Sequence, residues 1–178
     1  MTNIVFDSTA LIHFARADRL TELRNSSGSD KPILLTEVER ELAKGAPQRA
    51  SLDGTAKAWL KPAVELTEMM ELAAFTAYKA ELGGGPERNI GEAAVLAWTS
   101  VNGGIAIIDE DVARNIGRED GLQVHGSLWL MIRSFKNGIH DRATVEGTVS
   151  DLIHTGMRLP FADGTEFFPW ARRMSLLP

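Results

Sequence analysis

The sequence predicts a three-layer α/β/α domain with a central parallel sheet and a C-terminal helical extension. Short runs rich in Val and Ile alternate along the chain with longer segments of helical periodicity. Strands separated by helices of this length imply a parallel sheet that is covered on both faces. The chain has 178 residues, which fits one compact domain by size. We assign residues 1–140 to the α/β unit and residues 141–178 to an extension of the same domain.

The first strand is expected at residues 3–7, and either Ser8 or Thr9 can cap the helix that follows it. Apolar residues at helical spacing predict that this helix continues past residue 20. They form its expected buried stripe: Leu11, Ile12, Ala15, Leu20 and Leu23. Residues 25–30 are polar and predict a loop.

A second strand is expected at residues 33–35. Thr36 and Glu39 then form a capping-box pattern, in which two side chains bond free N–H groups at the start of a helix. This helix is expected to stop near residues 45–47, where Gly and Pro occur.

The middle of the chain carries signals of unequal strength. Residues 56–60 favour a helix and residues 63–66 a strand, both on short patterns. Residues 67–82 are rich in Ala, Glu and Met and predict a helix that ends at the Gly-Pro run of residues 83–86. Residues 90–99 predict another helix, which is apolar on most sides and should be buried.

The second half continues the alternation, beginning with the most strand-like run of the chain. The expected elements are a strand at 105–108, a helix at 111–117, a strand at 122–124, and helices at 127–136 and 143–155. The residues after these are looser sequence that contains Pro and Phe.

Composition limits the function classes. No stretch approaches the roughly 20 apolar residues that a membrane span needs, cysteine is absent, and no signal-peptide pattern opens the chain. We therefore expect a cytoplasmic protein without thiolate zinc sites or a cysteine nucleophile. The net charge is −5, which gives no support to a nucleic-acid ligand, because such proteins normally carry a basic face.

Four acidic residues with apolar neighbours are the most informative feature of the chain. They are Asp7, Glu41, Glu92 and Asp109. Two of them follow strands, and the carboxyl ends of parallel strands form sites at one edge of the sheet. Carboxylates about 4 Å apart repel each other by roughly 1 kcal/mol in water and about 4 kcal/mol near a protein surface. Converging carboxylates therefore indicate a divalent metal, and often phosphate chemistry.

Each acidic residue has a simpler interpretation when it is taken alone. Asp7 can serve as a partner of the next helix dipole, and Glu92 can do the same near the start of its helix. Glu41 is compatible with an ordinary solvated helix position. Only the joint pattern favours a metal site.

The joint pattern resembles the PIN-domain ribonucleases, and among them the VapC-like toxins of prokaryotic toxin–antitoxin pairs. Four short motifs occur in the family's order over roughly residues 3–140. They are Val5-Phe6-Asp7-Ser8-Thr9, Val38-Glu39-Arg40-Glu41-Leu42, Gly91-Glu92-Ala93-Ala94 and Ile107-Ile108-Asp109-Glu110-Asp111. The stretch from Gly121 to Leu128 also looks like the closing strand-turn-helix of one branch of the family.

The resemblance implies a PIN-like fold and a metal-dependent endoribonuclease, the toxin of a VapBC-type pair. It implies Asp7, Glu41, Glu92 and Asp109 as catalytic residues and Mg²⁺ or Mn²⁺ as cofactor. Metal ligands are expected among Asp7, Glu92, Asp109 and Asp111. The implied partners are an RNA substrate, a cognate antitoxin and a second copy of the chain, with no membrane.

The fourth motif departs from the family pattern. The usual motif has Thr, a spacer and Asp, whereas this chain has Asp109-Glu110-Asp111. We favour Asp109 because it directly ends the strand, while Glu110 or Asp111 can share the metal.

Candidate substrate-binding residues lie beside these motifs: Ser8, Thr9, Arg88 and Arg114. Arg118 is a further possible RNA contact. Ser8 and Thr9 also suit helix capping, and Arg114 also suits an i,i+4 pair with Glu110. The four tryptophans are interpreted as core or interface residues rather than as platforms for nucleobases.

Two further function classes stay open. An acidic-cluster α/β phosphatase or phosphotransferase, of the haloacid-dehalogenase or receiver type, would use an Asp nucleophile after the first strand. It also needs a late Lys next to a strand end, and none is evident. The other alternative is a PIN-fold binding module without catalysis. The presence of acidic residues at all four motif positions argues against it.

Overall fold

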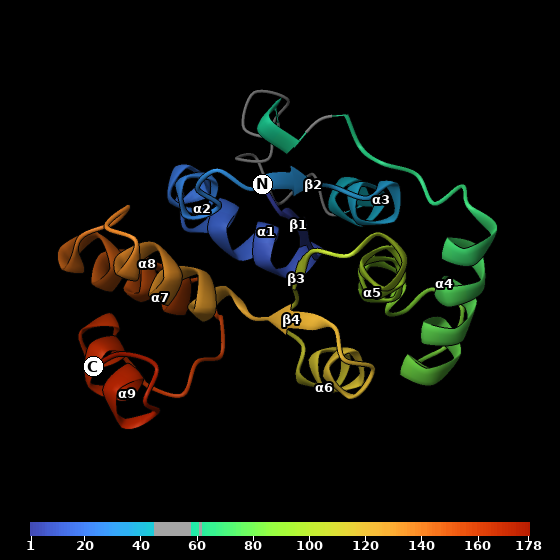
Figure 1. The fold of residues 1–178 in the computed structure, drawn as a ribbon. Coiled ribbons are helices and arrows are strands. Elements are labelled where there is room, and N and C mark those ends of the chain that lie inside the picture. Colours follow the sequence, from blue (N-terminus) through green and yellow to red (C-terminus); the bar gives the residue numbers. More distant parts are fainter. Residues whose placement is uncertain (45–57, 61) are drawn as a thin grey trace.

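The computed structural model describes residues 1–44, 58–60 and 62–178. Four strands form one sheet in the order β2-β1-β3-β4, and all neighbouring strands are parallel (Figure 1). The strands are β1 (Asn3–Phe6), β2 (Lys31–Ile33), β3 (Ile105–Ile107) and β4 (Gln123–His125). The α/β class with a central parallel sheet is therefore confirmed.

The two inner strands of the sheet, β1 and β3, are almost wholly apolar and pair with their neighbours in a parallel register. Ile4 of β1 pairs with Pro32 of β2 and with Ile105 of β3, and Ala106 pairs with Val124 of β4. Every residue of β3 is buried, because helices cover both faces of the sheet. This burial explains why the inner strands are continuous apolar runs rather than alternating patterns.

Helices cover the sheet in two outer layers (Figure 1). One layer holds α1 (Ser8–Arg16), α2 (Leu20–Ser26), α7 (Ser127–Lys136) and α8 (Arg142–His154). The other holds α3 (Thr36–Lys44), α5 (Ile90–Asn102) and α6 (Asp111–Glu119). The helix α4 (Met69–Leu82) packs along α5 on the outside of the second layer. As predicted, α5 is buried, and its residues from Ala93 to Thr99 are almost inaccessible to solvent.

The predicted single helix after β1 is wrong, because the chain breaks it into α1 and α2. Asp18 has a φ of 55°, a left-handed conformation that Asp tolerates better than most residues but that no α-helix can contain. Leu11 and Ala15 are buried on α1 as expected, and Leu23 is buried on α2. The apolar stripe therefore belongs to two helices that pack on the same core.

At Thr36, where a capping box is predicted, the N–H groups of Thr36 and Glu39 donate to the carbonyl oxygens of Val64 and Leu35, each at 2.9 Å. The Thr36 hydroxyl donates to the Val64 carbonyl oxygen at 3.2 Å, and a capping box forms instead between Glu68 and Glu71 at the start of α4. Residues 63–66 form no strand, only a single parallel bridge between Leu35 and Val64.

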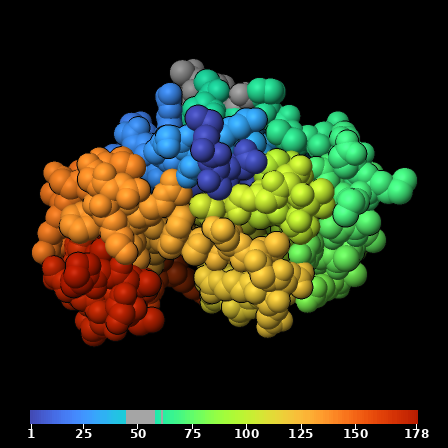
Figure 2. Space-filling model, viewed as in Figure 1, coloured from blue at the N-terminus to red at the C-terminus, as the bar shows by residue number. Residues whose placement is uncertain are grey.

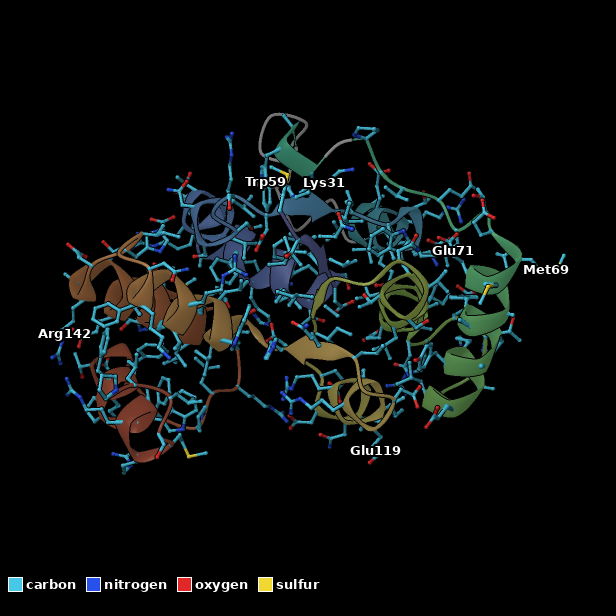
Figure 3. The ribbon with its side chains drawn as sticks, viewed as in Figure 1. Lys31, Trp59, Met69, Glu71, Glu119 and Arg142 are labelled. Carbon is cyan, nitrogen blue, oxygen red and sulfur yellow. The ribbon has the colours of Figure 1, made fainter. Side chains whose placement is uncertain are left out.

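The described residues also include two short 3-10 helices, η3 (Ala58–Leu60) and η4 (Gly164–Glu166). Residues 56 and 57 of the helix expected at 56–60 lie outside the described residues. Trp59 lies next to β2 near Lys31, whereas Met69 points into solvent from the start of α4 (Figure 3).

The C-terminal residues pack on the first helical layer and add α9 (Phe167–Arg173), which the sequence did not predict. Phe168 of α9 meets Phe135 of α7 edge-on, with 4.7 Å between ring centroids. Arg19 binds Asp151 of α8 through Nε at 2.8 Å. None of the described helices is long and apolar enough to cross a membrane.

Candidate active site

The four acidic residues of the motifs come from different elements that meet near the carboxyl edge of the sheet. Asp7 directly follows β1, and its N–H donates to the Ile107 carbonyl at 3.0 Å. Asp109 lies two residues after the end of β3. Glu41 lies on α3, and Glu92 lies in the first turn of α5. The parallel topology thus gathers residues that are up to 102 positions apart in the sequence.

Asp7 is wholly buried, and only one of its two carboxylate oxygens has a partner. Its Oδ2 accepts a hydrogen bond from the Thr9 N–H at 3.1 Å, so Asp7 caps the N-terminus of α1. Its Oδ1 is buried without a hydrogen-bond partner among the described residues. A buried polar atom without a partner is costly, and it marks the place where a cation or a proton would be stabilised.

Glu41 and Asp7 both lie against Gly91 at the start of α5. Glu41 Oε1 accepts from the Gly91 N–H at 2.9 Å. A Cβ atom added to Gly91 would lie 2.6 Å from Glu41 Oε2 and 3.0 Å from Asp7 Oδ1. Only glycine leaves room for both carboxylates at this place. The two acidic residues are therefore close neighbours on either side of one backbone position.

Glu92 completes an acidic group with Asp7 and Glu41. Burial raises the pKa of the Glu92 carboxyl, and the negative charges of Glu41 and Glu110 add to the rise. Among the three acidic residues of the fourth motif, it is thus Glu110 whose charge acts on Glu92.

The electrostatic cost of this arrangement is concentrated on Asp7. Burial raises the pKa of the Asp7 carboxyl to about 8, with a further contribution from Glu92 and a smaller one from Glu41, while hydrogen bonds from Thr9 and Ser8 oppose the rise. Without a counter-charge, this carboxyl holds its proton up to mildly alkaline pH.

Asp109 binds the N-terminus of α7 with both of its oxygens. Oδ1 accepts from the Ser127 N–H at 2.7 Å, and Oδ2 accepts from the Ser127 hydroxyl at 2.6 Å. Ser127 is itself fully buried. Asp109 therefore fixes α7 to the edge of the sheet, a structural role that the sequence interpretation missed. The signal was a Gly-Ser pair after a short strand, a place where a helix N-terminus needs an acceptor.

The structure places the other candidate residues at the periphery. The Asp111 side chain is 83% exposed and pairs with Arg114. Arg114 also donates to the carbonyl oxygens of Ile108 at 3.1 Å and Asp109 at 2.6 Å. It pairs with Asp111 rather than with Glu110, and these bonds occupy much of its guanidinium. Arg88 is exposed on the turn before α5.

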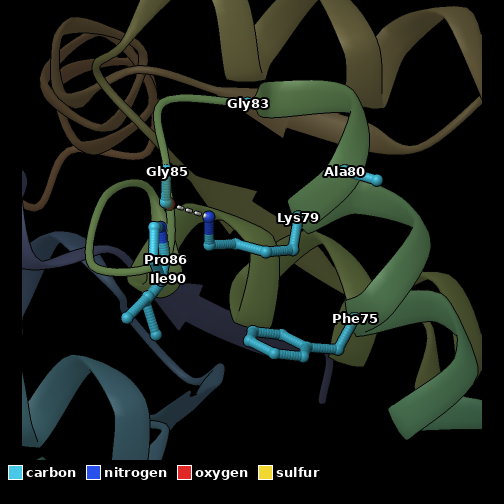
Figure 4. A pocket seen from close by; sticks show the side chains of 7 residues that line it. All are labelled: Phe75, Lys79, Ala80, Gly83, Gly85, Pro86 and Ile90. Atoms are coloured by element: carbon cyan, nitrogen blue, oxygen red, sulfur yellow. Dashed lines mark hydrogen bonds between the residues drawn. The ribbon is translucent and has the colours of Figure 1, made fainter.

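A mostly apolar groove lies beside the acidic group. It measures about 420 Å³ and lies between the end of α4 and the turn that leads into α5 (Figure 4). Phe75 and Ile90 line it, and Lys79 Nζ donates to the Gly85 carbonyl across it at 2.5 Å. Because Ile90 precedes Gly91, this groove adjoins the acidic group without containing any of its carboxylates.

The residue types of the acidic group suit a divalent cation, although their side chains are not arranged as a complete coordination site. Within the described ranges, no three His, Cys, Asp or Glu side chains are arranged as a ready metal site. Yet Asp7 offers an unpartnered buried oxygen, and Glu41 and Glu92 add hard carboxylate donors of the kind that Mg²⁺ and Mn²⁺ prefer. The residues present fit such an ion, and its charge would offset their repulsion.

A family model described as a PIN domain matches residues 3–163 of the chain. The chain belongs to the PIN-domain family. PIN domains are generally nucleases that use divalent metals, so membership indicates a nuclease-type function. A search among curated proteins and a search among solved structures each found no match.

The match extends the PIN domain beyond the residue range of the sequence motifs. Residues 141–163 include α8, which packs on α1 and α7. In this PIN domain the acidic group, the sheet and α8 thus fall within one matched region.

Proposed function

We propose that this PIN-domain protein is a metal-dependent endoribonuclease. The observation that carries the proposal is the buried Oδ1 of Asp7, which has no hydrogen-bond partner among the described residues, lies next to Glu41 and is acted on by the charge of Glu92. Carboxylates are placed at such high electrostatic cost chiefly at functional sites.

Asp7, Glu41 and Glu92 would hold the ion, and Glu110 adds negative charge beside Glu92. When bound, a divalent ion supplies a water of lowered pKa and stabilises charge on the phosphate. Ser8 and Thr9 lie in the first turn of α1 beside Asp7. The Thr9 N–H already donates to Asp7, so the hydroxyls of Ser8 and Thr9 are the groups that would bind the phosphate of the cleaved bond.

We further propose that the protein is the toxin of a VapBC-type pair, which acts on RNA, forms a dimer and is restrained by an antitoxin. The four ordered motifs support this finer assignment. A small reading frame upstream that encodes a DNA-binding N-terminus, and growth arrest on expression, are the expected observations. Growth that continues unchanged on expression of active enzyme would contradict the toxin role but not the nuclease.

The nuclease itself is tested with Asp7→Asn. The variant keeps an oxygen that can accept from Thr9 but removes the charge, so we expect metal-dependent cleavage of a labelled RNA to fall by at least about 100-fold, in the range of losses seen when a group that stabilises a transition state is removed. Cleavage is measured with Mg²⁺, with Mn²⁺ and with EDTA.

Asp141→Asn is the matched control. Asp141 caps α8 as Asp7 caps α1, since its Oδ1 accepts from the Thr144 N–H at 2.8 Å, but it is exposed and lies outside the acidic group. We expect it to cleave RNA like the wild-type protein. Undiminished cleavage by a folded Asp7→Asn protein would contradict the assignment.

The same assay separates the nuclease from a phosphatase. A protein of the phosphatase class would hydrolyse a small phosphate ester and leave RNA intact. We expect the reverse, because the carboxyl ends of the described strands carry no Lys that could serve such an enzyme.

A further inference from the structure

The side chains of His125 and Trp129 lie face to face at the end of β4, which is one of the two edge strands of the sheet. Their ring centroids are 4.1 Å apart, and the ring planes differ by only 8°. His125 ends β4, and Trp129 lies in the first turn of α7. Both residues are half-buried, in contrast to Trp98 of α5, which is buried as core. The pair therefore keeps part of its aromatic surface in contact with solvent.

The charged groups that act on this pair are positive. The guanidinium of Arg133 lies over the Trp129 ring, 5.2 Å from its centroid. Burial lowers the pKa of His125, and Arg118 and Arg133 lower it further. The imidazole is thus uncharged at neutral pH and offers an aromatic face rather than a charge. In a protein of net charge −5, two arginines beside one aromatic pair call for an explanation.

Arg118 is the cation that is most available on this surface. Its Nε donates to the Val124 carbonyl oxygen at 3.1 Å, which holds the guanidinium beside β4. Arg118 is exposed, and in the part of the chain that the structure describes it forms no ion pair. Arg133, in contrast, is paired with Asp30. A phosphate would therefore meet Arg118 more readily than Arg133.

This surface is directly connected to the acidic edge of the sheet. The Ile108 N–H donates to the His125 carbonyl at 2.9 Å, and Ser127, two residues after His125, binds both oxygens of Asp109. In Figure 1, β4 lies between α6 and the pair α7 and α8, and Figure 2 shows a hollow between α6 and α9 on the face that carries the N-terminus. A ligand on the stack would reach toward the carboxyl edge of the sheet.

We propose that Arg118, His125 and Trp129 form a binding surface for single-stranded RNA. A nucleobase stacks on the outer face of the His125 ring, because Trp129 lies against His125 on one face and under Arg133 on the other. A backbone phosphate pairs with Arg118. Base stacking requires an unpaired strand, because a duplex hides its base faces, and positive side chains interleaved with aromatic rings are the usual way in which proteins hold single strands. The identification of this strand as the substrate rests on the proposed nuclease function. The binding itself does not depend on that function.

Binding is tested without cleavage, on the full-length chain in EDTA, by the anisotropy of a fluorescein-labelled single-stranded 12-nucleotide RNA. His125→Ala is expected to raise Kd by about tenfold, within the range for the loss of one base–aromatic contact. Trp129→Leu should have a similar effect, because it removes the ring against which the imidazole is held. Trp129→Phe retains a ring and should recover most of the affinity. Arg118→Ala should weaken binding by several-fold and make Kd less dependent on salt concentration, because one phosphate contact is lost.

Arg172→Ala is the matched control for Arg118→Ala. Arg172 is also an exposed arginine whose Nε donates to a backbone carbonyl, that of Pro178 at 3.2 Å, but it lies on α9. Its replacement should leave Kd unchanged. Thermal unfolding is recorded for every variant, and if Trp129→Leu does not fold, His125→Ala and Arg118→Ala decide.

The outcomes separate this proposal from the nuclease assignment. Binding that is lost in the His125, Trp129 and Arg118 variants but kept in Asp7→Asn supports the surface, whatever the cleavage assay shows. Wild-type affinity in the three variants overturns it even if the protein cleaves RNA. Equal affinity for a single strand and for its duplex, or no binding at all, overturns it as well.

Discussion

The Asp7 carboxyl makes the stability of the metal-free protein depend on pH. Its pKa is about 8 in the folded protein, because burial and the charges of Glu92 and Glu41 disfavour ionisation, and it returns to an ordinary value of roughly 4 on unfolding. Between these two values the folded state holds the extra proton. Stability therefore falls as the pH rises from about 4 to about 8, and this contribution is gone above that range.

We expect Asp7→Asn to flatten this profile. In EDTA at pH 8 the variant should be more stable than the wild type, by an amount on the order of a few kcal/mol, since each pKa unit corresponds to about 1.4 kcal/mol. Urea unfolding between pH 5 and 9 measures it, with Asp141→Asn as the control that keeps the slope. A profile that stays equally steep in Asp7→Asn would show that another group titrates.

Asp109 and Glu110 are neighbours with different expected roles. Asp109→Asn can still accept from the Ser127 N–H, but it loses the charge that strengthens both bonds, so we expect a loss of about 1–2 kcal/mol in the free energy of unfolding. Glu110→Gln removes a charge that acts on Glu92. It should leave stability unchanged and lower metal-dependent cleavage by about tenfold or more.

Cleavage rates and urea unfolding of the two variants give the comparison. A larger loss of cleavage in Asp109→Asn than in Glu110→Gln, with the fold intact in both, would assign the fourth acidic position to Asp109 instead.

At the scale of elements, the start of α5 determines how closely the carboxylates of Glu41 on α3 and Asp7 after β1 can approach each other. Gly91 is helical, yet an added Cβ would lie 2.6 Å from Glu41 Oε2 and 3.0 Å from Asp7 Oδ1. Gly91→Ala should displace the flexible Glu41 carboxylate and lower metal-dependent cleavage by about tenfold or more. The free energy of unfolding should change by less than about 1 kcal/mol, because the higher helix propensity of Ala offsets the cost of displacing Glu41.

Gly147→Ala is the control for Gly91→Ala. Gly147 lies within α8, and its added Cβ would contact only Arg19 at 3.8 Å. Cleavage should be unchanged, and stability should rise by up to about 1 kcal/mol. Equal cleavage by the two variants would mean that the acidic group tolerates a displaced Glu41.

The elements also show how far the sequence determines this fold. Local patterns sufficed for β1, α7 and the buried α5, because apolar periodicity and end signals agree there. They failed at Asp18, where a stripe compatible with one long helix is divided between two by a single left-handed residue. Periodicity describes a face, and it cannot reveal a break that leaves the face apolar.

The candidate site was predictable to the extent that it follows from strand order. Asp7 could be placed at the carboxyl edge because it ends a strand of a parallel sheet. The roles of Gly91 and Ser127 could not be predicted, since each depends on a contact with a residue far along the chain: Gly91 with Glu41, and Ser127 with Asp109. The orientation of a side chain toward a distant partner leaves no mark in local sequence.

At the scale of the whole molecule, charge is unevenly distributed. The chain is acidic overall, and the carboxylates of Asp7, Glu41 and Glu92 gather at one edge of the sheet. Arg118 and Arg133 flank the His125–Trp129 pair near the end of β4. A divalent ion would offset the first group, and a backbone phosphate would match the second. Net charge alone therefore understated the suitability of this surface for RNA.

The C-terminal residues are expected to be part of the folding unit. Val145, Val149 and Leu152 of α8 and Phe168 of α9 are buried, and α8 packs on both α1 and α7. A chain that ends at residue 140 would expose the apolar faces that these residues cover. It would also lose the Arg19–Asp151 ion pair.

We therefore predict that residues 1–140 alone unfold at least about 10 °C below the full chain, since each kcal/mol shifts Tm by about 2–4 °C in a protein of this size. The full chain should show one cooperative transition, because the extension shares its core with the sheet domain. Calorimetry and circular dichroism of both chains provide the measurement. A shortened chain that unfolds cooperatively at the Tm of the full chain would show that the extension is a separate unit, and RNA cleavage by it would then place the whole nuclease within residues 1–140.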